Sequence, residues 1–143
     1  MNNIAEASID IFENNLKNNN AREVLNHWVK IKERIGVNNI EFIFAENLFS
    51  QDNKITVITK NSVIIIKTAY KEEPPRRLTT PIYVTESKKK IKEKNYEYTN
   101  GRDWGITFVY DDDSKLIFSK NSLEGTYYSD EINEAMFLYL INL

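Results

Sequence analysis

The chain has 143 residues, no cysteine, one histidine and a formal net charge of −2. A hydrophobic fraction of 41% with 12% aromatic residues suffices for the core of a single domain of this length, so the composition excludes global disorder. The absence of cysteine excludes a disulfide framework and favours a cytoplasmic location, and the balanced charge argues against a general coat for nucleic acid.

No stretch of the sequence is typical of a targeting or membrane segment. The first residues have neither a basic nor an apolar region, and the longest apolar run, residues 135–141, is far shorter than the ~20 residues that cross a bilayer. Lysine outnumbers arginine, and asparagine and isoleucine are abundant, which indicates an AT-rich genome such as that of a low-GC bacterium or its phage.

Two helices are predicted within residues 1–36. In the first, apolar and small residues recur at three- and four-residue steps, which places them on one helix face. They are Ile4, Ala7, Ser8, Ile11, Phe12 and Leu16. Residues 18–20, all asparagine, end the pattern, and Asn20 with Glu23 has the spacing of a capping box for the second helix. The second helix is expected to end at Gly36. Its apolar stripe is Ala21, Val24, Leu25, Trp28, Ile31 and Ile35.

From residue 39 to 119 the apolar residues recur every two positions, which is typical of strands. Segments 40–44, 54–59 and 63–68, with a turn at 60–62, predict an antiparallel meander whose third strand is buried on both faces. Residues 71–81 contain Pro74, Pro75 and Pro81, and they are expected to form a long exposed loop that carries Arg76 and Arg77.

Four further strands are predicted at 82–85, 96–98, 104–110 and 116–118. The dipeptide Asn100-Gly101 is a hairpin-turn signal, and residues 111–114 form the next turn. One face of the strand at 104–110 is aromatic and is predicted to be core, with an exposed interface as the alternative if the helices cover the other face. This row is Trp104, Ile106, Phe108 and Tyr110.

Residues 129–143 are predicted to form a C-terminal helix, with Ser129 as N-cap and two acids in the first turn. Its inward stripe is Ile132, Ala135, Met136, Tyr139, Leu140 and Leu143. The chain is therefore predicted to be one α+β domain, residues 1–143, with two N-terminal helices, about seven short, mostly antiparallel strands and one C-terminal helix. This order is similar to that of pleckstrin-homology-like barrels, and an open sheet fits the pattern equally well.

The inward positions of these elements predict the hydrophobic core. It is expected to include residues from the helices and from most of the strands. The predicted core residues are Ile11, Phe12, Leu25, Trp28, Phe42, Ile55, Val57, Ile64, Ile66, Phe108, Phe118, Met136 and Leu140.

Most catalytic and metal-binding chemistries lack their side chains in this sequence. His27, with Glu23 one helical turn earlier, is interpreted as a helix-surface residue with a charge partner, since no serine or cysteine nucleophile motif accompanies it. The four glycines do not have the spacing of a phosphate-binding loop. The acidic triplet 111–113 leads directly into a strand, so it is interpreted as turn chemistry rather than as a calcium or magnesium site.

A magnesium-dependent nuclease would need carboxylates and a lysine beside the metal. The sequence offers Asp52, Glu86 and Lys88, but this set departs from the usual pattern because Ile65 stands where a carboxylate is expected. The chain is therefore predicted to have no catalytic residues, no metal and no cofactor.

The remaining feature is a basic and aromatic segment that follows the proline-bracketed loop. Its lysines and tyrosines could hold phosphates and stack on bases, or they could form a solvated strand edge whose lysines discourage edge-to-edge pairing. The second interpretation is favoured because three glutamates dilute the positive charge. The candidate binding surface comprises Arg76, Arg77, Lys88, Lys89, Lys90, Lys92, Lys94, Tyr96 and Tyr98.

These observations predict a small non-enzymatic protein that binds another macromolecule, in the first place a protein, as an accessory or inhibitor protein of a phage or mobile element would. A nucleic-acid binder that uses Arg76, Arg77 and the block from Lys88 to Lys94 is the alternative, and the nuclease is a second one. A membrane partner is not expected, and a homodimer is left open.

Overall fold

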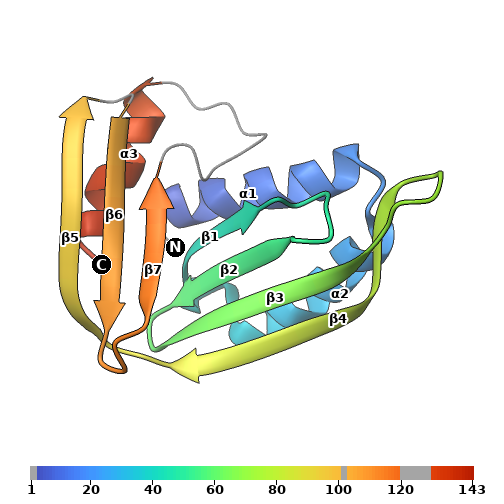
Figure 1. Cartoon of the computed structure of the whole chain (residues 1–143), viewed down its shortest axis with the longest axis horizontal. Helices are drawn as coiled ribbons and strands as arrows, with labels where there is room; N and C mark the ends of the chain where they lie inside the picture. Colours follow the sequence, from blue (N-terminus) through green and yellow to red (C-terminus); the bar gives the residue numbers. More distant parts are fainter. Residues whose placement is uncertain (1–2, 101–102, 120–129) are drawn as a thin grey trace. The chain divides into compact units, whose positions relative to one another are not determined.

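The computed structural model describes residues 3–100, 103–119 and 130–143. They form three helices and two antiparallel sheets of four and three strands, which confirms the predicted α+β class (Figure 1). Both sheets are open in the described part of the chain, so the alternative of a closed barrel is wrong. The chain divides into two compact units, Met1–Ser87 and Lys88–Leu143. That all 143 residues make one domain stays a prediction.

The first unit packs two helices on one face of a four-stranded sheet (Figure 1). The strand order β1-β2-β3-β4 contains the predicted meander and adds β4 as an edge strand. The elements are α1 (Asn3–Asn18), α2 (Arg22–Ile35), the short 3-10 helix η1 (Val37–Asn39), β1 (Ile40–Glu46), β2 (Lys54–Thr59), β3 (Ser62–Lys71) and β4 (Arg77–Lys88).

The prediction of a long proline-bracketed loop is wrong. Only residues 72–76 connect β3 to β4, and Pro81 lies within β4. A proline donates no backbone hydrogen bond, and an edge strand tolerates this because one side of the strand has no partner in the sheet. The proline therefore marks an edge strand, and Arg77 belongs to that strand rather than to a loop.

The predicted capping box at Asn20 is also wrong. Asn20 has a positive φ of 57° and ends α1, while Ala21 precedes α2 without a side-chain cap. The N–H of Asn20 donates to the carbonyl of Lys17 at 3.2 Å, and that of Ala21 donates to Leu16 at 2.9 Å. These two bonds make a Schellman motif, in which asparagine tolerates the left-handed conformation. The Glu23 carboxylate instead accepts a hydrogen bond from the Thr79 hydroxyl.

The core of the first unit is formed by the inner sides of α1 and α2 and by alternate residues of β1 to β4. The predictions of Ile11 and Leu25 as core residues are wrong, because both side chains are only partly buried. Ile9, which was not predicted, is the buried isoleucine of α1 because it lies on the face turned to the core. β3 is covered on both faces only in its first half, because Lys67 is exposed. The other core residues predicted in this unit, Phe12, Trp28, Phe42, Ile55, Val57, Ile64 and Ile66, are buried.

A buried asparagine connects the β1–β2 loop to β3. The amide nitrogen of Asn53 donates to the carbonyls of Ser50 and Thr68, each at 2.8 Å, and its amide oxygen accepts from the Thr68 N–H at 2.8 Å. The side chain therefore makes the bonds to Thr68 that a neighbouring strand residue would make. Because these groups are shielded from water, they depend on Asn53 for their hydrogen bonds.

We expect Asn53→Ala to lower the free energy of unfolding by about 2–4 kcal/mol, because buried backbone groups lose their partners. Urea unfolding measures this loss. Asn61→Ala is the matched control, since Asn61 is exposed in the turn between β2 and β3, and it should change the same free energy by less than about 0.5 kcal/mol. Equal effects of the two substitutions would contradict the role given to Asn53.

The second unit consists of a three-stranded sheet, in the order β5-β6-β7, and one helix. The row predicted on the middle strand, from Trp104 to Tyr110 at alternate positions, is buried. It contacts the C-terminal helix, so the row is core and not an interface. Phe137, which the predicted stripe omits, is buried among three aromatic rings. Ser129 lies outside the described residues. The elements are β5 (Ile91–Asn100), β6 (Asp103–Tyr110), β7 (Lys115–Ser119) and α3 (Asp130–Ile141).

Phe108→Ala should lower the free energy of unfolding by about 3–5 kcal/mol. Phe108 is fully buried and its ring packs edge-on against Phe118 with centroids 5.5 Å apart, so the substitution leaves a cavity. Chemical denaturation tests this, with Ile117→Ala as control because Ile117 is 61% exposed on the next strand. A loss below about 1 kcal/mol for Phe108→Ala would show that the core of the second unit is misassigned.

Candidate functional site

The acidic triplet forms the turn between β6 and β7. The N–H of Asp113 donates to the carbonyl of Tyr110 at 2.9 Å, and Asp113 has a positive φ of 65°. The carboxylate of Asp112 accepts from both the backbone N–H and the hydroxyl of Ser114. The triplet therefore serves turn geometry, as predicted, and the described residues contain no group of acids arranged to hold a metal ion.

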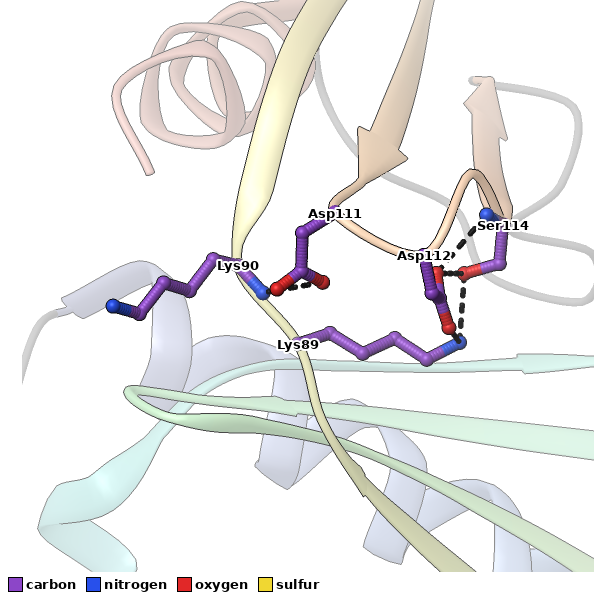
Figure 2. Close-up of polar contacts among 5 residues, drawn as sticks. All are labelled: Lys89, Lys90, Asp111, Asp112 and Ser114. Carbon is purple, nitrogen blue, oxygen red and sulfur yellow. Dashed lines mark hydrogen bonds and ion pairs between the residues drawn. The ribbon is translucent and has the colours of Figure 1, made fainter.

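The start of the lysine block packs against this turn (Figure 2). The ammonium of Lys89 donates to the Ser114 hydroxyl at 2.8 Å and lies 3.5 Å from a carboxylate oxygen of Asp112. The side chain of Lys90 extends away from the turn, while its backbone exchanges hydrogen bonds with Asp111. The lysines and the aspartates are separate features of the sequence, and the fold brings them together.

Ion pairing with the turn continues at Lys92, whose ammonium pairs with the carboxylate of Asp113. This hydrogen bond and the negative charge of Asp113 raise the pKa of Lys92. Hydrogen bonds from the Ser114 hydroxyl and N–H, together with the Lys89 ammonium, lower the pKa of Asp112. Two lysines of the block thus have carboxylate partners, which reduces the positive charge available to phosphate groups.

Lys94 contacts the end of the C-terminal helix. Its ammonium donates to the backbone carbonyl of Ile141 at 3.0 Å. Carbonyls at the end of a helix have no partner within the helix and carry partial negative charge, so a cation there is favourable. Lys94 is therefore a structural contact between β5 and α3.

The rings of Tyr96 and Tyr98 pack against the ring of Phe137 in α3. The Tyr98 ring is stacked on Phe137 with centroids 4.7 Å apart, and the Tyr96 ring meets it edge-on at 5.9 Å. Both tyrosines nevertheless remain largely in solvent, with exposures of 57% for Tyr96 and 42% for Tyr98. Partial burial and the nearby Glu134 carboxylate raise the pKa of Tyr98, so its phenol stays protonated and can donate to Glu134.

The remaining basic residues of the candidate surface are exposed. Arg76 and Arg77 lie at the entry to β4, and no hydrogen bond or ion pair of either is found within the described residues. Lys88, the last residue of β4, and the side chain of Lys90 are exposed as well. The structure therefore divides the predicted surface into exposed cations and cations that already have partners.

The proposed nuclease residues do not converge. Asp52 lies in the β1–β2 loop, beside Asn53, which bonds to Thr68 near the end of β3. Glu86 accepts a hydrogen bond from Ser62, at the beginning of β3. At about 3.3 Å per strand residue these two places are roughly 20 Å apart, too far for both carboxylates to hold one metal ion.

His27 is exposed on α2, as expected for a helix-surface residue. None of the described helices is both long and apolar enough to cross a membrane.

Comparison of the chain with protein-family models, with curated proteins and with solved structures found no match.

Tyr110 provides a spectroscopic test of this region. It is buried, with the Lys89 ammonium 5.5 Å from the centre of its ring, and burial together with Asp112 raises the pKa of its phenol to about 12. Because the folded value exceeds the ordinary value near 10, Tyr110 stabilises the fold below about pH 10, and this contribution is lost as the pH rises towards 12.

Titration of phenolate absorbance near 295 nm should show a late step near pH 12 that is missing in Tyr110→Phe. The same variant should lose less stability than the wild type as the pH rises above about 10. Superimposable titration curves of the two proteins would contradict the buried, protonated state of Tyr110.

Proposed function

We propose that this chain is a non-enzymatic protein-binding domain whose working surface is the outer edge of β5. An extended segment of a partner would add to this edge as a further strand. The observation that carries the proposal is that β5 is an edge strand whose second half exposes the rings of Tyr96 and Tyr98. Both rings pack against the buried ring of Phe137.

The backbone of β5 supports strand addition. β5 spans Ile91–Asn100 and pairs with β6 on one side, so within the described residues its other side offers unpaired N–H and C=O groups. A partner strand gains main-chain hydrogen bonds from such an edge and gains specificity from the side chains that alternate along it.

The two halves of β5 differ in how well the edge is protected. The first half has a register irregularity between Ile91 and Glu93, and it carries Lys92 and Lys94. Bulges and lysines both discourage a further strand from pairing with an edge. The second half, from Asn95 to Thr99, has no lysine and pairs regularly with β6 as far as Tyr98. The accessible part of the edge therefore coincides with the two tyrosines.

The aromatic rings support a protein partner. Tyrosine supplies a large contact area at a small cost in conformational entropy, and it is enriched at protein interfaces. Stacking on Phe137 holds the Tyr98 ring in place before a partner arrives, which reduces the ordering cost of binding. The ion pairs of Lys89 and Lys92 support the same conclusion, because they weaken the case for a phosphate ligand.

Selection from a displayed library of random peptides tests the proposal with the full chain as bait. Selected peptides should bind Tyr96→Ser/Tyr98→Ser at least about tenfold more weakly than wild type, as expected for the loss of central aromatic contacts. Tyr83→Ser is the matched control, because Tyr83 is 64% exposed on another edge strand, β4, and affinity should not change. If the double variant folds poorly, Tyr96→Ser alone should still weaken peptide binding.

Two further measurements identify the mode of binding. Methylation of alternate backbone nitrogens in a selected peptide should abolish binding if the peptide joins β5 as a strand. Peptides that bind the tyrosine variants as well as wild type would overturn the proposal. So would tight binding of single-stranded DNA that falls steeply with salt and is lost on Arg76→Glu/Arg77→Glu, which would establish the nucleic-acid alternative.

A further inference from the structure

We infer that the segment bound by β5 is basic, with Lys or Arg at two positions four residues apart; this inference rests on the proposed function. The basis is the distribution of carboxylates along β5, where the described residues place Glu93 at the end of the first half and Glu97 in the second half, with Glu134 of α3 beside Tyr98.

One face of β5 presents two glutamates. Residues that pair across antiparallel strands share a face, so Glu93, Asn95 and Glu97 lie on the side of Val109, Thr107 and Gly105. All three β5 residues are exposed. The two glutamates make no ion pair within the described residues, and the basic residue of this face, Lys115, lies on β7, two strands away.

The other face presents the two tyrosines and a third carboxylate. Lys94, Tyr96 and Tyr98 pair with Phe108, Ile106 and Trp104, and Glu134 of α3 lies beside Tyr98. Tyrosine rings attract ammonium and guanidinium groups, and a carboxylate strengthens that attraction. This face therefore accepts an apolar side chain or an arginine over the rings.

The lysines of β5 form no ion pair with Glu93 or Glu97 within the described residues. The Lys92 ammonium is paired with Asp113, and the Lys94 ammonium is bonded to the Ile141 carbonyl. The carboxylates of Glu93, Glu97 and Glu134 thus have no ion-pair partner within the described residues and face an incoming strand.

The register of an added strand gives the sequence pattern of the partner. Directly opposed side chains lie about 4.5–5.5 Å apart at Cβ, close enough for opposite charges to attract. Basic residues opposite Glu93 and Glu97 are four positions apart. The position opposite Tyr96 is adjacent to the basic residue opposite Glu97, and it should be apolar, aromatic or arginine. The position opposite Lys94 should not be basic.

Three capped ten-residue peptides test the inference. They share their apolar positions and differ only at the two positions four residues apart, which are both Lys, both Gln or both Glu. Against the full chain, the Lys peptide should bind about tenfold more tightly than the Glu peptide, and this advantage should shrink as salt rises. Glu93→Gln/Glu97→Gln should remove the advantage. Glu72→Gln/Glu73→Gln, which makes the same charge change in the exposed β3–β4 connection, should preserve it.

The outcomes separate the inference from the proposed function. If Gln or Glu peptides bind as tightly as the Lys peptide and Tyr96→Ser/Tyr98→Ser still abolishes binding, the function stands and the basic partner is wrong. Selected library peptides that depend on the tyrosines but lack basic residues would also overturn the basic partner alone. If every peptide that binds is indifferent to the tyrosine variants, or if none binds, the proposed function fails and the inference fails with it. Concentration-dependent sedimentation abolished by Tyr96→Ser/Tyr98→Ser would identify a second copy as occupant and overturn the basic partner.

Discussion

Backbone hydrogen bonding at the edge of an open sheet is the constraint on which the rest of this structure depends. Within the described residues each sheet ends in strands that pair on one side only, and each such edge must be protected from uncontrolled pairing or used. In β4, Pro81 removes one donor, and in β5 the first half carries lysines while the second half carries tyrosines. Where protection stops and large aromatic side chains begin, an edge becomes a surface that can take a partner.

Local patterns predicted most of the fold because they reflect what each segment buries. Period-two alternation identified β2 to the residue, and Gly36, with a positive φ of 85°, does end α2. The errors arose where one residue type serves two purposes. Asparagine can cap the start of a helix or adopt the left-handed conformation at its end, and Asn20 does the second. Phe137 was missed because α3 is apolar on several sides, so that periodicity could not identify which side meets β5 and β6.

The candidate site was less predictable than the fold because its electrostatics depend on residues far apart in the sequence. Lys92 and Asp113 are separated by 21 positions, and only the register of β5 on β6 brings them together. The sequence shows a basic block and an acidic turn as separate segments, whereas in the folded unit two lysines of the block, Lys89 and Lys92, pair with carboxylates of the turn. Tyr96 and Tyr98 were found from composition, but their support by Phe137 required the helix to be placed on the strand.

The two tryptophans lend themselves to optical measurements, because each compact unit contains one of them. Trp28 and Trp104 are both buried, and neither indole N–H has a hydrogen-bond partner within the described residues. An indole in such apolar surroundings fluoresces at shorter wavelength than one in water. Replacing either tryptophan with phenylalanine leaves a protein whose emission reports on the other unit alone. A chain without cysteine also accepts a single engineered thiol for attaching a dye, so energy transfer from each indole to that dye becomes measurable.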